Sequence, residues 1–240
     1  LGVQVRQADY AQPATLDIAF QGATKVLLIS SSALGERVAQ HGNVIDAARR
    51  AGVALLAYTS LLHADTSPLG LAAGRTAAEA LLRASGVPHV VLRNGWYTEN
   101  YLASLPAVLQ HGAVIGSAGE GRIASAARAD YADAAAAVLT RDDQAGQVHE
   151  LAGDTSYTLA EFAAEVGRQT GRAIPYVNLP EADYRGALLG AGLPEPLAHL
   201  LADSDVGASK GGLFDDGHRL SALIGRPTTA LAAMVEAALR

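Results

Sequence analysis

The sequence predicts an α/β fold in which a doubly wound parallel sheet carries helices on both faces. In the first half of the chain, short aliphatic runs alternate with longer Ala- and Leu-rich segments, an alternation typical of βαβ units. The aliphatic runs are almost continuously apolar, as expected for strands that are covered on both faces. Glycines follow the expected helices and allow each of them to end before the next strand.

Strands are expected at three aliphatic runs, 25–30 (KVLLIS), 53–60 (VALLAYTS) and 88–93 (PHVVLR). Residues 148–151 could add a further strand, and residues 1–6 (LGVQVR) already have the alternation of a strand. Right-handed crossovers through the intervening helices would bring these strands into one sheet.

Helices are expected where apolar residues recur at helical spacing. Thr158 and Glu161 form a capping-box pattern that would open a helix closed by Gly171. Asp130 would cap a helix beginning at Tyr131. The other expected helices are 37–51, 71–85, 181–191, 196–202 and 229–239. We therefore divide the chain into a sheet-bearing domain, 1–152, and a smaller, mainly helical region, 153–240, laid against the strand ends.

Composition restricts the classes of function. Half of the 240 residues are apolar and 18% are charged, so the chain can bury a full core. The absence of cysteine excludes thiol nucleophiles and predicts a cytoplasmic protein. A net charge of -6 without a Lys/Arg cluster argues against direct binding to nucleic acid. No apolar run is long enough to span a membrane, and no spacing of His residues indicates a metal site.

Ligands bind parallel sheets at the carboxyl ends of the strands, so the residues after each strand are the candidates for a site. The segment that follows residues 88–93 combines amide, aromatic and acidic side chains with a glycine, over residues 94–100 (NGWYTEN). This combination suits a cofactor or substrate pocket. The same composition also fits a loop whose aromatic side chains close the core.

Six strings along the chain resemble, in the same order, the NmrA-like quinone oxidoreductases, which are atypical short-chain dehydrogenase/reductases. They are VRQADY (5–10), LLISSS (27–32), YTSLLHADTSPLGLA (58–72), LRNGWYTENYL (92–102), ASAARADYA (124–132) and DSDVGASKGGLFDD (203–216). The resemblance implies a Rossmann-like NAD(P)-binding domain over 1–152, a substrate-binding region over 153–240, and NADPH or NADH as the cofactor.

The resemblance also implies roles for individual residues. Asp9 would lie near the adenine, the loop from Ser30 to Leu34 would pass the ribose and pyrophosphate, and the loop from Asn94 to Glu99 would line the nicotinamide. The cofactor-binding residues implied in this way are Asp9, Ser30, Ser31, Ser32, Leu34, Asn94, Gly95, Trp96, Tyr97 and Glu99.

The lysines exclude the usual chemistry of short-chain dehydrogenases. The chain has only Lys25 and Lys210, and the residues four positions before them are Gln21 and Val206, so no Tyr-x-x-x-Lys pair exists. A quinone instead accepts hydride from the reduced nicotinamide, and its oxygen can take a proton from a Tyr hydroxyl or from water.

We therefore predict an NAD(P)H:quinone oxidoreductase in which Tyr97 is the ring-side catalytic residue and Asn94 orients the carboxamide. Ser60 is a second catalytic candidate, because related enzymes carry an active-site Ser at its place. The alternative is an NmrA-like redox sensor that binds the dinucleotide without turnover and acts through a protein partner.

By the plan of that family, a strand, a Gly-rich turn and a helix, together about forty residues, would precede Leu1. These elements would hold the pyrophosphate. A chain without them would bind the cofactor weakly or not at all, would lack the central strand of its sheet, and could form homo-oligomers through exposed apolar surface.

Three strings that look catalytic are interpreted as structural. Residues 116–121 (GSAGEG) are expected to form a β-hairpin loop, because no helix follows them. Residues 207–211 (GASKG) match a nucleophile elbow but lack its strand and helix, so a flexible loop near the substrate is expected. His63 and Asp65 are too close in sequence for a catalytic dyad, and a capping role is expected for Asp65.

Overall fold

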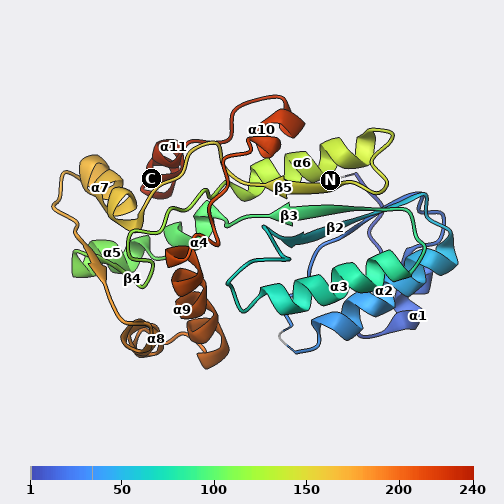
Figure 1. Ribbon diagram of the computed structural model, residues 1–240, viewed down its shortest axis with the longest axis horizontal. Helices are drawn as coiled ribbons and strands as arrows, with labels where there is room; N and C mark the ends of the chain where they lie inside the picture. Colours follow the sequence, from blue (N-terminus) through green and yellow to red (C-terminus); the bar gives the residue numbers. More distant parts are fainter. Residues whose placement is uncertain (1, 34) are drawn as a thin grey trace.

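The computed structural model describes residues 2–33 and 35–240. It has a four-stranded parallel sheet of order β1-β2-β3-β5 on one side and a helical lobe with the two-stranded β4-β6 sheet on the other (Figure 1). The strands of the larger sheet are β1 (Lys25–Leu28), β2 (Leu55–Leu61), β3 (His89–Asn94) and β5 (Val148–Leu151). These strands point toward the helical lobe, so their carboxyl ends face it (Figure 1).

Helices cover both faces of the larger sheet, which confirms the predicted doubly wound fold. One face carries α2 (Arg37–Ala51) and α3 (Ala72–Ala84), with α1 (Pro13–Ala19) against α2, and the other carries α6 (Arg128–Thr140) and α10 (Arg219–Ile224). Successive residues of β3 alternate between the faces, because side chains of a strand point to opposite sides. Val91 packs in the cluster under α2 and α3, whereas Val90 and Leu92 pack under α6.

The helical lobe is built from segments on both sides of residue 152. Its elements are α4 (Thr98–Leu102), α5 (Leu105–His111), β4 (Val114–Gly116), α7 (Leu159–Thr170), β6 (Tyr176–Asn178), α8 (Glu181–Gly190), α9 (Glu195–Ser209) and α11 (Leu231–Ala238). The strand β4 pairs with β6, and α4 packs on α11, while α10 returns to α6. Because the chain passes between the sheet-bearing part and the helical lobe more than once, the domain boundary after residue 152 stays a prediction.

The strongest local signals of the sequence are confirmed. Thr158 Oγ1 accepts the Glu161 amide at 3.1 Å, and Glu161 returns a bond to the Thr158 amide at 2.8 Å. Gly171 ends that helix in the left-handed conformation, with φ 68°. The strand β1 ends two residues before the predicted limit because the Ser30 amide donates to the Thr59 side chain at 2.9 Å, outside the backbone ladder.

The strand expected at residues 1–6 is wrong for the described part of that segment, which is irregular. A turn at 9–12 and the helix α1 follow it, and sequence analysis missed this helix. A single strand is not stable without a neighbour, and β2 is the only strand paired with β1 among the residues that the structure describes.

The segment at 116–121 is not a hairpin loop, because the strand before it pairs in parallel with β6, some sixty positions away (Ile115 with Val177). The string at 207–211 is not a flexible loop either, since α9 extends to Ser209 and buries Gly207 and Ala208. Gly207 packs so closely on Leu69 that a Cβ would lie 2.8 Å from its side chain.

Two capping assignments are also wrong. Asp130 lies inside α6, which begins two residues earlier, and it accepts the Thr229 amide at 2.8 Å. Asp65 instead pairs with Arg93, at 2.8 Å from its Nη1. Both carboxylates bind groups that are remote in sequence, and such partners leave no local pattern. In the described part of the chain, no helix has the length and apolar character needed to cross a bilayer.

Candidate active site at the carboxyl ends of the strands

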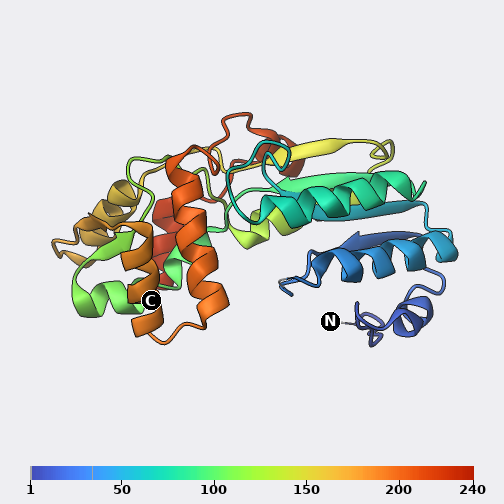
Figure 2. The ribbon, with the colours of Figure 1, turned by 60° about the horizontal axis from the view of Figure 1, so that its bottom comes forward.

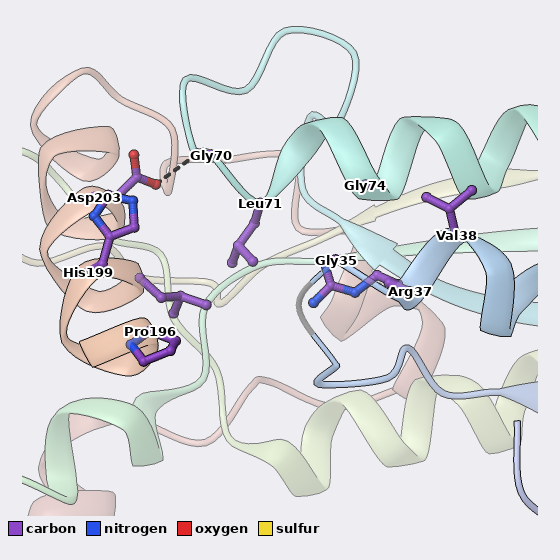
Figure 3. A pocket seen from close by; sticks show the side chains of 10 residues that line it. Gly35, Arg37, Val38, Gly70, Leu71, Gly74, Pro196, His199 and Asp203 are labelled. Atoms are coloured by element: carbon purple, nitrogen blue, oxygen red, sulfur yellow. Dashed lines mark hydrogen bonds between the residues drawn. The ribbon is translucent and has the colours of Figure 1, made fainter. Parts of the chain in front are cut away.

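A cleft of about 290 Å³ opens between the sheet-bearing part of the molecule and α9 (Figure 3). One wall comes from the start of α2 and the start of α3, and the other from α9. The lining residues are Gly35, Arg37, Val38, Gly70, Leu71 and Gly74 on the first wall, and Pro196, His199, Leu200 and Asp203 on the second. Leu71, Val38, Pro196 and Leu200 make much of the surface apolar, which suits a planar organic ligand.

Arg37 is the main charged group on the sheet side of the cleft. Its side chain runs from α2 toward the cleft (Figure 3) and the residue is only 8% exposed. Its Nε donates to the Ser31 carbonyl at 3.0 Å, which fixes the plane of the guanidinium. Its Nη1 lies against the first turn of α3, where a Cβ on Gly74 would be 3.3 Å away.

The loop after β1 is held by hydrogen bonds from neighbouring elements. The Ser30 amide donates to Thr59 Oγ1 at 2.9 Å, and the Ser31 amide donates to His41 Nε2 at 3.0 Å. Ser30 Oγ is buried and has no partner among the described residues. Ser32 is exposed. Leu34, which was predicted to contact the cofactor, lies outside the described residues.

His41 is a neutral hydrogen-bond acceptor that helps to hold this loop in place. Burial, together with the charges of Arg75 and Arg37, lowers its pKa to about 4. A neutral imidazole can accept the Ser31 amide at Nε2. The charges of Arg75 and Arg37, which contribute to the low pKa after burial, make the surroundings of this loop electropositive.

Ser60 belongs to a buried charged network under α3. Its hydroxyl donates to Glu79 Oε1 at 2.5 Å. Arg93 binds the same carboxylate through Nε and Nη2, at 3.0 and 2.7 Å, and reaches Glu150 at 2.9 Å through Nη1. These contacts, chiefly with Glu79, raise the pKa of Arg93. The proton of Ser60 is therefore engaged by Glu79, and its catalytic role stays a prediction.

Asn94 ends β3 with an unused acceptor. The residue is 6% exposed, and its Oδ1 has no hydrogen-bond partner among the described residues. Gly95 follows it at a close approach, where a Cβ would lie 3.1 Å from the Leu151 carbonyl and 3.1 Å from the Tyr131 hydroxyl. Trp96 is 7% exposed and packs in the core of the helical lobe, which agrees with the alternative of an aromatic side chain that closes the core.

Tyr97 is half-buried between one cationic and one aromatic neighbour. The guanidinium of Arg128 stacks on its ring at 4.1 Å from the centroid, and the Tyr131 ring meets it edge-on at 5.2 Å. Glu99 Oε1 accepts the Arg128 amide at 2.9 Å and so caps the start of α6. The ring of Tyr97 is thereby fixed, and no hydrogen bond engages its hydroxyl among the described residues.

Asp9 lies in the irregular N-terminal segment. Its two carboxylate oxygens accept the Ala11 amide at 2.8 Å and the Gln12 side chain at 3.0 Å. These bonds shape the turn before α1. The adenine contact implied for Asp9 stays a prediction.

The parallel register brings several predicted residues to one edge of the sheet. Leu28 is level with Tyr58, and Ser60 is level with Arg93, directly before Asn94. Ser30, two residues beyond Leu28, and Asn94 are therefore about 10 Å apart across two strand spacings. The cleft itself is lined by other residues, and neither Asn94 nor Tyr97 is among them.

The polar side chains that line the cleft, Arg37, His199 and Asp203, were not predicted from the sequence. Arg37 begins a predicted helix that follows a strand end, so its position after a strand was an available signal. His199 and Asp203 offered none, because α9 reaches the sheet only in the folded chain. Asp203 accepts the Gly70 amide at 2.8 Å, across 133 positions of sequence.

The fold and the site define an NAD(P)H-binding protein: residues 1–142 match the profile of the NAD(P)H-binding family, and the chain belongs to this family. It is 60% identical over 234 residues to quinone oxidoreductase 2 of Escherichia coli (strain K12), an alignment covering 98% of this chain and 82% of that protein. The resemblance stated from the sequence is confirmed.

Two solved structures extend the comparison. The crystal structure of the NADPH-dependent quinone oxidoreductase of Escherichia coli in complex with NADPH matches with a TM-score of 0.97 and 58% identity, over 100% of this chain and 84% of that chain. Triphenylmethane reductase of Citrobacter sp. in complex with NADP(H) matches with a TM-score of 0.94 and 34% identity, over 99% and 84% of the two chains. The predicted Rossmann-like fold is confirmed.

Proposed function

We propose that this protein is an NAD(P)H-dependent oxidoreductase that transfers a hydride from the nicotinamide to a quinone or a similar planar electrophile. The observation that carries the proposal is the 0.97 TM-score with a quinone oxidoreductase in complex with NADPH. The cleft supports it, because open parallel sheets bind dinucleotides and their substrates beyond the carboxyl ends of the strands.

The polar groups at the strand ends fit a nicotinamide. Asn94 Oδ1 and Ser30 Oγ are buried oxygens without a partner among the described residues. A buried acceptor without a hydrogen bond costs free energy, and a carboxamide N–H at Asn94 would remove that cost. When bound, the reduced nicotinamide supplies the hydride. Asn94 would hold its amide, and Ser30 would hold a hydroxyl of the adjoining ribose.

The remaining residues orient the acceptor and supply its proton. Leu71, Val38 and Pro196 offer apolar surfaces for the flat ring and exclude water from it. Reduction of a quinone to the hydroquinone consumes one hydride, which the reduced nicotinamide would supply, and one proton. Tyr97 carries the hydroxyl that we assign to this proton, water would return the proton to the tyrosine, and Arg128 keeps the Tyr97 ring in place. Holding both rings in register is the main contribution of the protein.

Consumption of NADPH with 1,4-benzoquinone tests the activity. We expect turnover by the chain and a fall of kcat of about a hundredfold in Tyr97→Phe, the lower end for loss of a general acid. Tyr184→Phe in α8 is the matched control and should keep the parental kcat. Turnover that is unaffected by Tyr97→Phe would contradict the assigned proton donor.

Calorimetry with NADP⁺ separates the alternatives. Binding without turnover would overturn the proposal and favour the redox-sensor function. Failure of NADP⁺ and NADPH to bind would show that this chain does not act on nicotinamide cofactors by itself. Binding together with turnover supports the oxidoreductase.

A further inference from the structure

Arg37 is a buried cation without a counter-ion. It is 8% exposed, and none of the carboxylates in the described residues comes within ion-pair distance of it. Its Nε is bonded to the Ser31 carbonyl, and neither Nη atom has a hydrogen-bond partner in the described part of the chain. Burial lowers the pKa of Arg37, and the nearby charge of Arg75 adds to this. Guanidinium groups that are mostly buried are normally paired.

The groups beside the Arg37 guanidinium, at the start of α3, carry the same sign of charge as Arg37. Nη1 of Arg37 lies against Gly74, in the first turn of α3. That helix has 13 residues, no side-chain cap and no acidic residue in its first turn. The positive partial charge of its N-terminus is met by the carboxylate of Asp203, which accepts the amide of Gly70 just before the helix. Arg75, in the same turn, adds a second positive charge behind the cleft wall, where its Nη1 donates to the Thr59 carbonyl at 2.9 Å.

The acidic group nearest in the cleft makes no ion pair with these guanidinium groups. Asp203 projects from α9 on the opposite wall, and its Oδ2 accepts the Gly70 amide of the first wall at 2.8 Å. No ion pair joins Asp203 to Arg37 or Arg75 in the described chain. His199 shares the wall of Asp203. The cationic cluster thus has a ligand-accessible side, and the surfaces beside it are those of Val38, Leu71 and Pro196.

We propose that the cleft contains an oxyanion subsite, formed by Arg37 and the first turn of α3 and reinforced by the nearby charge of Arg75, next to an apolar slot. The subsite would take a carboxylate, sulfonate or phosphate attached to a planar ring. This inference rests on the proposed function and narrows its substrate class to aromatic electrophiles that carry an anionic group.

Equilibrium binding tests the subsite without any turnover. The probes are naphthalene-2-sulfonate and its neutral analogue naphthalene-2-sulfonamide, which share the ring and nearly the same volume. We expect the sulfonate to bind about tenfold more tightly, the usual scale of a hydrogen bond to a charged group. Arg37→Met should remove that preference and leave the affinity for the sulfonamide within about twofold.

Arg49→Met is the matched control, because Arg49 lies on the same helix, with its side chain 58% exposed and paired with Asp46. It should retain the preference. The variant Arg37→Lys should keep part of it, since a lysine supplies the charge but not the planar pair of donors. Equal affinities of the sulfonate and the sulfonamide, or a preference unchanged by Arg37→Met, would overturn the proposal.

Saturating NADP⁺ distinguishes the two sources of the anion. If the sulfonate still binds with its preference in the presence of NADP⁺, the subsite serves the acceptor. If NADP⁺ displaces the sulfonate and itself binds more weakly to Arg37→Met, the subsite holds a cofactor phosphate, which supports the oxyanion site and overturns the narrowed substrate class.

Turnover distinguishes failure of this inference from failure of the proposed function. The probes are 1,4-naphthoquinone and 1,4-naphthoquinone-2-sulfonate. If both quinones are reduced, and the Arg37→Met variant has the same kcat/KM as the parental chain for each of them, the proposed oxidoreductase function is supported. The narrowing of the substrate class to anionic aromatic electrophiles is then overturned. If neither quinone is reduced but the protein still binds the sulfonate more tightly than the sulfonamide, the proposed oxidoreductase function is overturned. The anion subsite is then still supported.

Discussion

Single residues in this molecule show how burial sets charge. Arg93 and Glu79 are almost fully buried as a pair, with several hydrogen bonds between them, so each compensates the other. His41 stays neutral because it is buried among cations. Arg37 is buried without an ion pair within the described chain, and this is the basis of the proposed anion subsite.

Asp205 is a buried carboxylate whose charge costs stability. It is 4% exposed, and the Ser117 amide donates to its Oδ2 at 2.9 Å. Burial raises its pKa from 3.8 to about 6, and the bond from Ser117 only partly offsets this. Between these two values the folded state retains a proton that the unfolded state has lost. The free energy of unfolding therefore falls as the pH rises through that window.

We expect Asp205→Asn to be more stable than the parental chain by about 2 kcal/mol at pH 7.5 and equally stable below pH 4. Urea denaturation at both pH values measures the difference. His41 has the opposite linkage, since its lowered pKa makes stability fall as the pH drops below its ordinary value. It is present in both chains and cancels in the comparison. A gain that is the same at both pH values would contradict the assigned pKa.

At the scale of elements, local signals in the sequence predict well and remote ones do not. The limits of α2 and β5 match the sequence prediction to the residue, because apolar spacing and a following glycine are properties of the segment itself. The pairing of β4 with β6 was missed, since it depends on segments about sixty positions apart. Asp130 was misassigned for the same reason, as its partner Thr229 lies 99 positions away.

The contact between two loops at the carboxyl edge of the sheet gives a prediction at the scale of elements. Gly153 follows β5, and its amide donates to the Ala124 carbonyl at 2.9 Å. A Cβ at this position would lie 2.1 Å from the Ser125 carbonyl oxygen, which is backbone and cannot turn away. We expect Gly153→Ala to lower the free energy of unfolding by about 3 kcal/mol, the upper end for overpacking.

The matched control is Gly190→Ala at the end of α8, where a Cβ would meet nothing within 4 Å. This change should be neutral or stabilising by a few tenths of a kcal/mol, roughly the helix preference of alanine over glycine. Chemical denaturation of the two variants gives the comparison. Equal stability of Gly153→Ala and Gly190→Ala would show that the two loops can separate at no cost.

At the scale of the whole molecule, the sequence predicted the sheet and its covering helices. It did not predict the cleft, because the cleft exists only where α9 meets the starts of α2 and α3 (Figure 3). Candidate residues such as Ser30, Ser60 and Asn94 lie at the carboxyl edge of the sheet, and their roles stay predictions. The charge at that edge comes from helix residues whose side chains converge only in the folded chain.

The same view of the whole molecule shows an open sheet edge at β1. Figure 2 places β1 on the outer side of the sheet, with the N-terminal segment and α1 beyond it. No strand pairs with that side of β1 within the described residues. Ile29, which continues the strand, is 60% exposed, and Ile18 in α1 is 62% exposed. Unpaired backbone groups beside exposed apolar side chains favour pairing with another chain.

We therefore expect the chain of these 240 residues to self-associate through this edge at high micromolar concentration, as sedimentation velocity would measure. Ile29→Lys should shift the population toward monomer, because a charge on an edge strand opposes pairing. Leu189→Lys removes a comparable exposed apolar side chain, 41% exposed on α8, and should leave the distribution unchanged. A parental chain that stays monomeric at these concentrations, or an equal effect of both lysines, would exclude the β1 edge as the interface.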